Sequence, residues 1–413
     1  MDFMLPTPTD NGARLAAILP TAIASMARSA GIDPVSLLQD AKILRGSPEE
    51  QAALAEGRLP AVRSIVLIVV DGLGQANLKS AAGHARTLTS LPTRRIETVI
   101  PSTTGAALTT LTTGTLPGQH GLIGYKIRHP ELGLVTTLKD WAGIEDRRAW
   151  QRSEPLFALA PRIGARAIAI GRPAHASGGL TEAILTGTEY HGGQTIADRF
   201  SIASRLVRGD DPLLAYLYVD ELDKVAHNEG WQSDKWLLRL EQLDAALQDL
   251  LRSLPGDVGV IVTADHGVVD VPREKRMLLD NLIDTSQVKL IGGEPRMRSL
   301  YLRDGADAAP VAAEVQSALG KLAWVGTRDE AIEAGWFGDV AHGIAERLGE
   351  VLIAARGQAA FMLTTDDPAV HEMVGQHGSV SDEERGVPLA LGGALDGTGF
   401  AGAVAALADS RSV

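Results

Sequence analysis

A chain of 413 residues can form one large α/β domain with an added subdomain, or two domains, with ample buried core. Its hydrophobic content of 45% and charged content of 22% are ordinary for a globular protein. The formal net charge of −12 disfavours a general nucleic-acid-binding role, because no surplus of Lys and Arg neutralises phosphates. An acidic chain can still bind phosphate esters if metal ions supply local positive charge.

The chain has no cysteine, which excludes disulfides and thiolate metal sites. Any metal must therefore be held by oxygen and nitrogen ligands. The apolar stretch Leu15 to Met26 is interrupted by Pro20 and has the charge pattern of a poor signal peptide. No apolar run approaches the roughly 18 residues of a membrane span. We expect a cytoplasmic protein that spans no membrane and binds no nucleic-acid polymer; the sequence does not indicate its oligomeric state.

The first 60 residues predict an N-terminal helical arm. Residues Leu15 to Ser29 have helix-like spacing. The segment Arg45 to Arg58 is polar, which indicates an exposed linker or part of the arm.

Continuous apolar runs predict three central strands, of the kind that parallel sheets bury on both faces, and a further strand is predicted from Ala167 to Ile170. Helices are predicted between and after them, most clearly where leucines recur with amphipathic spacing. Strands that alternate with helices indicate a doubly wound α/β domain, in which ligands bind beyond the carboxyl ends of the strands. The predicted strands are Ser64 to Val70, Ala167 to Ile170, Leu213 to Val219 and Val258 to Thr263, and the predicted helices are Gly105 to Thr113, Pro155 to Leu159 and Trp236 to Leu251.

The pattern changes between residues 274 and 368, where we predict a smaller cap inserted into the core. Within it, Arg298 to Leu302 and Glu350 to Ala355 are typical of strands, whereas Pro310 to Leu322 and Arg328 to Ala334 are typical of helices. The catalytic core is then formed by residues 61–273 together with residues 369–413.

Carboxylates and imidazoles follow the predicted strands. Asp71 ends the first strand before a glycine turn, where an ordinary turn residue is the alternative interpretation. Asp265 and His266 follow another strand, and the alternative there is a buried polar turn whose groups need partners. Asp223 and His227 are spaced one helical turn apart, so both could reach one ion.

Each of these segments also has a simpler interpretation. Asp223 and His227 could be a surface ion pair, with Asp220 and Glu221 as alternative ligands, and His377 among glycines could be an exposed loop residue. Thr104 lies in Pro101-Ser102-Thr103-Thr104-Gly105 at a predicted helix N-terminus, where one of these hydroxyls is expected to cap the helix. A helix N-terminus also stabilises an anion, and a metal would activate a threonine alkoxide there.

Taken together, these segments resemble the nucleotide pyrophosphatase/phosphodiesterase family of the alkaline phosphatase superfamily. The resemblance runs in order from about Ser64 to Pro388. The matching segments are Asp71-Gly72, Pro101-Ser102-Thr103-Thr104, Thr113-Gly114-x-x-Pro117-x-x-His120-Gly121, Asp223-x-x-x-His227, Asp265-His266-Gly267 and His377-Gly378.

The resemblance implies an alkaline-phosphatase-like core: a mostly parallel central sheet flanked by helices, with the inserted cap. It also implies two divalent metal ions, with Zn²⁺ the expected pair and Mn²⁺ the alternative. One ion would be held by Asp71, Thr104, Asp265 and His266, and the other by Asp223, His227 and His377. Thr104 would be the nucleophile and would form a phospho-threonine intermediate that water then hydrolyses.

The chain departs from the family in two places. The family's Phe-Pro-Asn-His after the nucleophile is replaced by Gly105-Ala106-Ala107-Leu108, and its phosphoryl-contacting Asn by Tyr125, followed by Lys126. We expect Tyr125 and Lys126 to contact substrate, with Arg128 or Lys139 as a further cation. These changes leave the substrate class open between two reactions. The first is hydrolysis of a phosphodiester or nucleotide pyrophosphate. The second is hydrolysis of a phosphomonoester or phosphonate on the same two-metal core. A catalytically silent member that binds metal or a partner is a third interpretation, disfavoured because no predicted ligand is substituted.

Overall fold

The computed structural model describes residues 4–55, 57, 59–138 and 141–411. Its centre is a seven-stranded sheet in the order β2-β17-β8-β1-β7-β5-β6. The five strands β8, β1, β7, β5 and β6 run parallel, whereas β17 pairs antiparallel with both β8 and β2. The bounds are β1 Ser64–Val70, β2 Thr93–Glu97, β5 Arg166–Gly171, β6 Glu189–Gly192, β7 Leu213–Val219, β8 Val258–Thr263 and β17 Gly386–Gly393.

The predicted α/β class and mostly parallel sheet are confirmed. Strands β1, β7 and β8 have the predicted bounds, and almost every residue in them is buried, as expected for strands covered on both faces. Strand β17 was not predicted, because its short apolar run contains Pro388 and begins and ends with glycines, so that it lacks a strand pattern.

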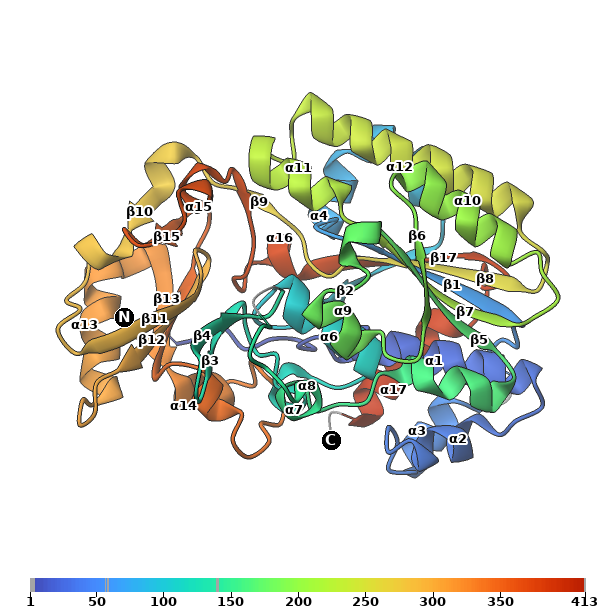
Figure 1. The fold of residues 1–413 in the computed structure, drawn as a ribbon, viewed down its shortest axis with the longest axis horizontal. Helices are drawn as coiled ribbons and strands as arrows, with labels where there is room; N and C mark the ends of the chain where they lie inside the picture. Colours follow the sequence, from blue (N-terminus) through green and yellow to red (C-terminus); the bar gives the residue numbers. More distant parts are fainter. Residues whose placement is uncertain (1–3, 56, 58, 139–140, 412–413) are drawn as a thin grey trace.

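Helices cover both faces of the sheet (Figure 1). One face carries α1, α6 and α17, with the short α2 and α3 beyond them, and the other carries α4, α5, α10, α11 and α12. The bounds are α1 Ala13–Ser29, α2 Pro34–Asp40, α3 Pro48–Ala53, α4 Gln75–Ser80, α5 Arg86–Ser90, α6 Thr104–Thr113, α10 Ile196–Leu206, α11 Glu221–Glu229, α12 Asp234–Ser253 and α17 Phe400–Arg411.

Helix α1 of the N-terminal region lies within the core. It is buried continuously from Leu15 to Ala27 and belongs to the same apolar cluster as β1. Within the segment Arg45 to Arg58, predicted to be an exposed linker or part of the arm, the helix α3 packs against α17. The Ser47 hydroxyl accepts from the Glu50 backbone N–H, and the buried Glu50 carboxylate accepts from the Ser47 N–H in return, so a capping box fixes this short helix.

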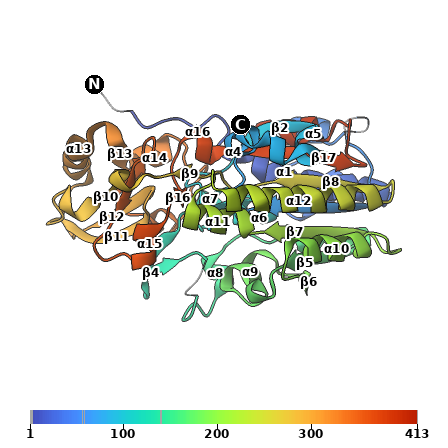
Figure 2. The ribbon, with the colours of Figure 1, turned by 90° about the horizontal axis from the view of Figure 1, so that it is seen from above.

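A second, smaller sheet lies beside the central one (Figures 1 and 2). Its order is β11-β12-β14-β13, all antiparallel, and it has an apolar core of its own with helix α13 packed on it. It falls within the range predicted for the insert, although β11 and β13 were not anticipated. The bounds are β11 Val288–Glu294, β12 Met297–Leu302, β13 Ala323–Thr327, β14 Val351–Ala355, α13 Ala308–Leu319 and α14 Arg328–Glu333.

The remaining strands form three two-stranded pairs, and short helices connect them. None of the helices in the described ranges combines the length and apolar character that a membrane crossing requires. The remaining bounds are β3 Lys126–His129 with β4 Gly133–Thr136, β9 Val269–Asp270 with β16 Gly375–Gln376, β10 Arg276–Leu278 with β15 Ala360–Met362, α7 Pro117–His120, α8 Arg147–Trp150, α9 Gly179–Ile184, α15 Pro368–Glu372 and α16 Asp382–Arg385.

The order of the central strands positions the candidate ligands. Strands β8, β1 and β7 are neighbours, so their carboxyl ends meet at one edge of the sheet. Asp265 follows β8, Asp71 follows β1, and Asp223 lies in the first turn of α11, which begins two residues after β7. Segments almost 200 residues apart in sequence are thus adjacent at this edge.

Candidate metal centre

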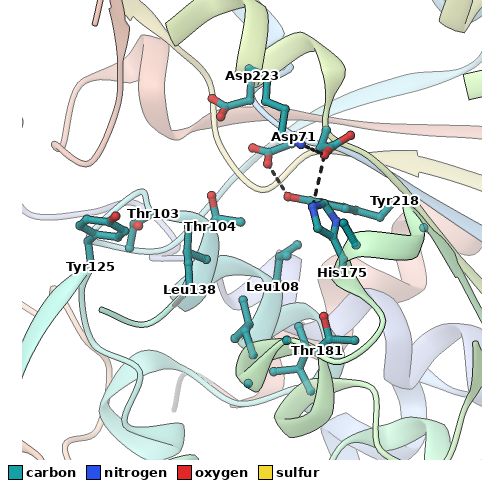
Figure 3. Close-up of a pocket in the computed structure, with 18 of the residues that line it drawn as sticks. Asp71, Thr103, Thr104, Leu108, Tyr125, Leu138, His175, Thr181, Tyr218 and Asp223 are labelled. Atoms are coloured by element: carbon teal, nitrogen blue, oxygen red, sulfur yellow. Dashed lines mark hydrogen bonds and ion pairs between the residues drawn. The ribbon is translucent and has the colours of Figure 1, made fainter. Parts of the chain in front are cut away.

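Three buried carboxylates converge at the carboxyl ends of the central strands. Asp265 is the most constrained: its Oδ1 accepts from the backbone N–H of Gly72 at 3.2 Å and of His266 at 3.0 Å. Asp71 accepts a hydrogen bond from the hydroxyl of Tyr218 (Figure 3). Asp223 lies on α11, with its Oδ2 3.1 Å from Nε2 of His227. All three residues are buried, with at most 8% of their surface exposed.

Three imidazoles complete the cluster, and each is oriented by its Nδ1. The Nδ1 of His227 donates to the carbonyl of Gly375 at 2.7 Å, that of His377 to the carbonyl of Ser102 at 2.9 Å, and that of His266 to the carbonyl of Gly267 at 3.3 Å. A proton on Nδ1 leaves the lone pair on Nε2, which is the arrangement of a metal-binding histidine.

The atoms fall into two overlapping groups. Nε2 of His266 lies 3.1 Å from Oγ1 of Thr104, 3.4 Å from Oδ1 of Asp71 and 3.5 Å from Oδ2 of Asp265. Ligand atoms of Asp223, His227 and His377 form a second group, all within 4.8 Å of one another. Asp71, Asp223 and His266 satisfy the same limit, so Asp223 lies between the two groups. The structure therefore brings together all seven side chains expected to hold metal.

The electrostatics show strong crowding of negative charge. Burial raises the pKa of Asp71 well above its ordinary value, and the nearby carboxylates of Asp265 and Asp223 raise it further. Burial alone would also raise the pKa of Asp223, but the imidazole of His227 outweighs it and lowers that pKa. In turn, burial disfavours the charged form of His227, but Asp223 prevails and raises the pKa of His227 to about 9. The cluster thus favours additional positive charge at its centre.

Divalent cations fit this donor set. One oxygen of each carboxylate, namely Oδ1 of Asp71, Oδ1 of Asp223 and Oδ2 of Asp265, is buried without a hydrogen-bond partner among the described residues. Leaving such oxygens unpaired costs about 1–3 kcal/mol each, and more when they are charged. Carboxylate oxygens with imidazole nitrogens suit Zn²⁺ and Mn²⁺.

Thr104 is the first residue of α6, and its buried hydroxyl faces the carboxylate cluster. The expected hydroxyl cap is absent: Thr103 occupies the N-cap position, but its side chain makes no capping hydrogen bond. Ser102 acts differently, since its hydroxyl donates to the carbonyl of Ser379 and accepts from the N–H of Gly378. Ser102 therefore fixes the loop that carries His377 against the N-terminus of α6.

The two residues expected to contact substrate differ in which cavities they line. Tyr125 lines a cavity of about 700 Å³ that opens beside Thr104. Lys126, the next residue, begins β3. It lines a second, small cavity, which Tyr125 also lines. Lys126 is not among the residues that line the cavity beside Thr104, and its contact with substrate stays a prediction. Arg128 is exposed on β3, and Lys139 lies outside the described residues.

Sequence reasoning missed two side chains of the site. Tyr218 donates to Asp71, and its alternation with Tyr216 and Asp220 at the end of the predicted strand was the available signal. Glu294, at the end of β11, lines the cavity, and its Oε2 lies 3.9 Å from Nδ1 of His377. Burial, with the nearby Glu384, raises the pKa of Glu294 to about 8. No local pattern marks Glu294, because it reaches the site from the second sheet.

Cationic side chains surround Asp220 at another wall of the cavity. Arg172 donates to its Oδ1 at 2.6 Å, the amine of Lys224 donates to its Oδ2, and Nε2 of His175 lies 3.5 Å from Oδ2. Burial alone would raise the pKa of Asp220, but Arg172 and Lys224 hold it at about 2. Asp220 is therefore a structural anion and not a free ligand.

The fold and this centre agree with the comparison to known families. Residues 65–380 match the type I phosphodiesterase / nucleotide pyrophosphatase family. This match spans most of the chain, and the protein belongs to that family.

Individual relatives are distant. An uncharacterized pyrophosphatase/phosphodiesterase of Schizosaccharomyces pombe is 23% identical over 251 residues, which are 54% of this chain and 49% of that protein. Human ectonucleotide pyrophosphatase/phosphodiesterase family member 5 is 23% identical over 205 residues, or 45% and 40% of the two chains. The chain thus spans half or less of the length of the curated relatives it matches.

Solved structures support the fold. Murine ectonucleotide pyrophosphatase/phosphodiesterase 5 superposes with a TM-score of 0.62 at 20% identity, covering 79% of this chain and 87% of that one. Phosphonoacetate hydrolase from Sinorhizobium meliloti 1021, solved with phosphonoformate, superposes with a TM-score of 0.63 at 19% identity, covering 84% and 97%. At this level of identity the likeness extends to the fold alone.

Proposed function

We propose that the protein is a metal-dependent hydrolase of phosphodiester or pyrophosphate bonds, with Thr104 as the nucleophile. The carrying observation is the position of the Thr104 hydroxyl, 3.1 Å from Nε2 of His266 and beside buried carboxylates that lack partners. Membership of the type I phosphodiesterase / nucleotide pyrophosphatase family supports the same reaction.

The proposed division of ligands is supported by the two overlapping groups of atoms, which share Asp223. One divalent cation would be held by Asp71, Thr104, Asp265 and His266, and a second by Asp223, His227 and His377. When bound, the cations supply Lewis-acid stabilisation of negative charge on phosphoryl oxygens. Zn²⁺ is the proposed pair, with Mn²⁺ the alternative, because both accept oxygen and imidazole ligands.

The protein's own residues prepare the nucleophile. The N-terminus of α6 carries partial positive charge, which favours the alkoxide form of Thr104. The oxygen of Thr104 attacks phosphorus as the bond from phosphorus to the leaving oxygen breaks, which gives a phospho-threonine. Water then cleaves that intermediate and restores the hydroxyl. The apolar lining of the cavity limits competing access of water to the bond under attack.

A second candidate is a phosphonate or phosphomonoester hydrolase on the same centre. The observations that favour it are the structural likeness to phosphonoacetate hydrolase and the cation Lys224 with the imidazole of His175 on the cavity wall. These side chains could meet the extra negative charge of a monoester or of a carboxylate. Their engagement with Asp220 weakens this candidate relative to the first.

A side-by-side assay distinguishes the candidates. The purified protein is given bis-(p-nitrophenyl) phosphate, p-nitrophenyl phosphate, a nucleoside-monophosphate ester and phosphonoacetate, with Zn²⁺ and with Mn²⁺. We expect the diesters to have the highest kcat/KM. Preference for the monoester or for phosphonoacetate would favour the second candidate.

Two variants test the nucleophile. Thr104→Ala should reduce turnover at least about 10³-fold, while the metal content stays near that of the parent protein because the other ligands remain. Thr112→Ala is the matched control, since Thr112 lies in the same helix and its hydroxyl bonds to the carbonyls of Leu108 and Thr109. It should retain the parent's activity. Full activity in Thr104→Ala would overturn the assignment of the nucleophile.

A further inference from the structure

The cavity beside Thr104 is much larger than a phosphoryl group. Its volume of about 700 Å³ is in the range of sites that enclose a whole organic ligand. The carboxylates and imidazoles described above occupy one end. The remainder is lined by residues of α6 and α9, by Leu138 and Trp141, and by residues of the strands β5, β6 and β7. That part of the cavity determines what a substrate can carry besides its phosphorus.

The wall that leads away from the nucleophile is apolar. Leu108 lies one helical turn after Thr104, so both side chains lie on the same face of α6. In Figure 3, Leu138 and Leu108 lie below Thr104 with Thr181 beyond them, whereas Asp71 and Asp223 lie above it. We call this region, lined by Leu108, Leu138, Trp141, Leu180 and Ile184, the apolar chamber.

Two glycines allow the walls of the chamber to approach closely. A Cβ on Gly105 would lie 2.4 Å from Oγ1 of Thr137, and a Cβ on Gly179 would lie 2.3 Å from Cγ of Trp141. Thr137 therefore packs directly on α6, and Trp141 packs directly on α9. Nε1 of Trp141 donates to the carbonyl of Thr137 at 3.1 Å, which fixes the indole ring in the wall. Close contacts of two glycines with the side chains of Thr137 and Trp141 thus shape the chamber.

Two polar groups near the apolar chamber are engaged within the protein, whereas the hydroxyl of Thr181 also lines the cavity. The indole N–H of Trp141 is bonded to Thr137, and the hydroxyl of Tyr190 donates to the carbonyl of Arg172 at 2.7 Å. The five chamber side chains are aliphatic apart from this indole, and so offer no free donor or acceptor to the polar edge of a nucleobase. An apolar group gains free energy by leaving water for such a surface, whereas a polar group loses hydrogen bonds.

We propose that the apolar chamber binds an uncharged apolar organic substituent, alkyl or aryl, on the phosphorus that Thr104 attacks. This inference rests on the proposed function and narrows its substrate to diesters whose retained group is lipophilic. A nucleoside is then not the preferred substituent.

The test compares three diesters that share the p-nitrophenolate leaving group: the methyl, hexyl and 5′-thymidyl esters. The parent protein should show a kcat/KM at least about tenfold higher for the hexyl than for the methyl ester. The reason is that each methylene placed in a well-fitted apolar pocket strengthens the binding of the transition state. The thymidyl ester should not exceed the hexyl ester. Equal values for hexyl and methyl, or a preference for thymidyl, would overturn the inference.

Variants of the chamber wall give a matched comparison. Thr181→Trp fills the chamber from the cavity-lining face of α9 and should bring the hexyl-to-methyl ratio close to one. Thr186→Trp is the control, because Thr186 is exposed just beyond α9, and it should keep the parent's ratio. If Thr181→Trp folds poorly, Leu138→Glu serves instead, because Leu138 is half-buried and a charge there disfavours an apolar group. A parental ratio in the folded variants contradicts the proposal.

A binding experiment separates this inference from the proposed reaction. Calorimetry on metal-loaded Thr104→Ala protein compares hexylphosphonate with methylphosphonate, neither of which needs to be hydrolysed. Tighter binding of hexylphosphonate by at least about tenfold supports the chamber even if no diester is cleaved, in which case the proposed function alone fails. Equal binding of the two together with active hydrolysis overturns the chamber and leaves the function intact.

Discussion

Arg296 and Glu384 form an ion pair that is fully buried between the second sheet and the central domain. Nη2 of Arg296 lies 2.6 Å from Oε2 of Glu384, and both side chains are 0% exposed. Glu384 also accepts from the N–H of Ser379, two residues after His377, and its backbone carbonyl accepts from the N–H of Gly267. Through this pair, the turn that carries Glu294 is connected to two loops that carry predicted metal ligands.

Removing one partner of this pair should strongly destabilise the protein. Arg296→Met leaves the Glu384 carboxylate buried without its cation, which we expect to lower the free energy of unfolding by about 3–5 kcal/mol. Urea denaturation measures the change. The control is Arg273→Met, whose partner Glu372 and own side chain are both largely exposed, and which should change the free energy by at most about 1 kcal/mol. A similar decrease in the free energy of unfolding in both variants would contradict the expectation that burial makes the Arg296–Glu384 pair more important for stability.

Tyr218 should tune metal affinity through Asp71. Its hydroxyl is the hydrogen-bond donor to a predicted ligand, and removal of such a supporting partner typically weakens metal binding about 10–100-fold. Tyr218→Phe should therefore raise the dissociation constant for Zn²⁺ by that factor, as measured by competition with a chromophoric chelator. Tyr301→Phe removes a buried hydroxyl that donates to the carbonyl of Arg347 in the second sheet, and its Zn²⁺ affinity should match the parent's.

Metal removal should affect both activity and stability. We expect chelation by EDTA to abolish turnover. Readdition of Zn²⁺ at about 100 times its dissociation constant should stabilise the fold by about 2.7 kcal/mol, since a ligand that binds only the folded state stabilises it by mass action. Activity and the thermal midpoint are followed together. Mg²⁺ is the comparison ion, because it prefers oxygen ligands. Equal recovery with Mg²⁺ would contradict imidazole ligation, and turnover unaffected by EDTA would contradict the whole centre.

His120 should make stability depend on pH. Burial, with the charge of Arg347, lowers the pKa of His120 from 6.5 to about 3, and its Nδ1 accepts from the N–H of Leu122 while Nε2 faces Oγ1 of Thr110. Between pH 6.5 and pH 3 the unfolded chain binds a proton at this residue that the folded protein does not. Stability is therefore fully present above pH 6.5 and falls as the pH decreases, by at most about 1.4 kcal/mol per pH unit.

The variant His120→Gln isolates this contribution. It is expected to be less stable at neutral pH, but its free energy of unfolding should fall less steeply between pH 6.5 and pH 5. The slope should be smaller by up to about 1.4 kcal/mol per pH unit, which corresponds to the uptake of one proton. Urea denaturation at several pH values provides the slopes. An unchanged slope would show that His120 does not remain neutral in the folded protein.

Much of the site could be predicted because its residues follow strongly patterned strands. The runs before Asp71 and Asp265 are continuous and apolar, so both their strand character and the exit of the chain at one sheet edge were evident from the sequence. The spacing of Asp223 and His227 likewise fixed a shared helical face. Local pattern marked these residues and the hydroxyl of Thr104 as candidates, and the family resemblance supplied the roles predicted for them.

The contacts that join distant segments depended on the tertiary structure. The antiparallel β17 and the approach of Glu294 from the second sheet have no signature in their own segments. The alternation of Tyr216, Tyr218 and Asp220 is visible in the sequence, but only the tertiary structure decides that Tyr218 bonds to Asp71.

The sequence by itself determined the chemistry of the centre: which residues can ligate, which hydroxyl can attack, and that cysteine takes no part. Only the tertiary structure decided the shape of the space around them. Ligand identity is a property of single side chains and short spacings, whereas the apolar chamber results from close approach of α6, α9 and the segment after β4, which packing alone determines.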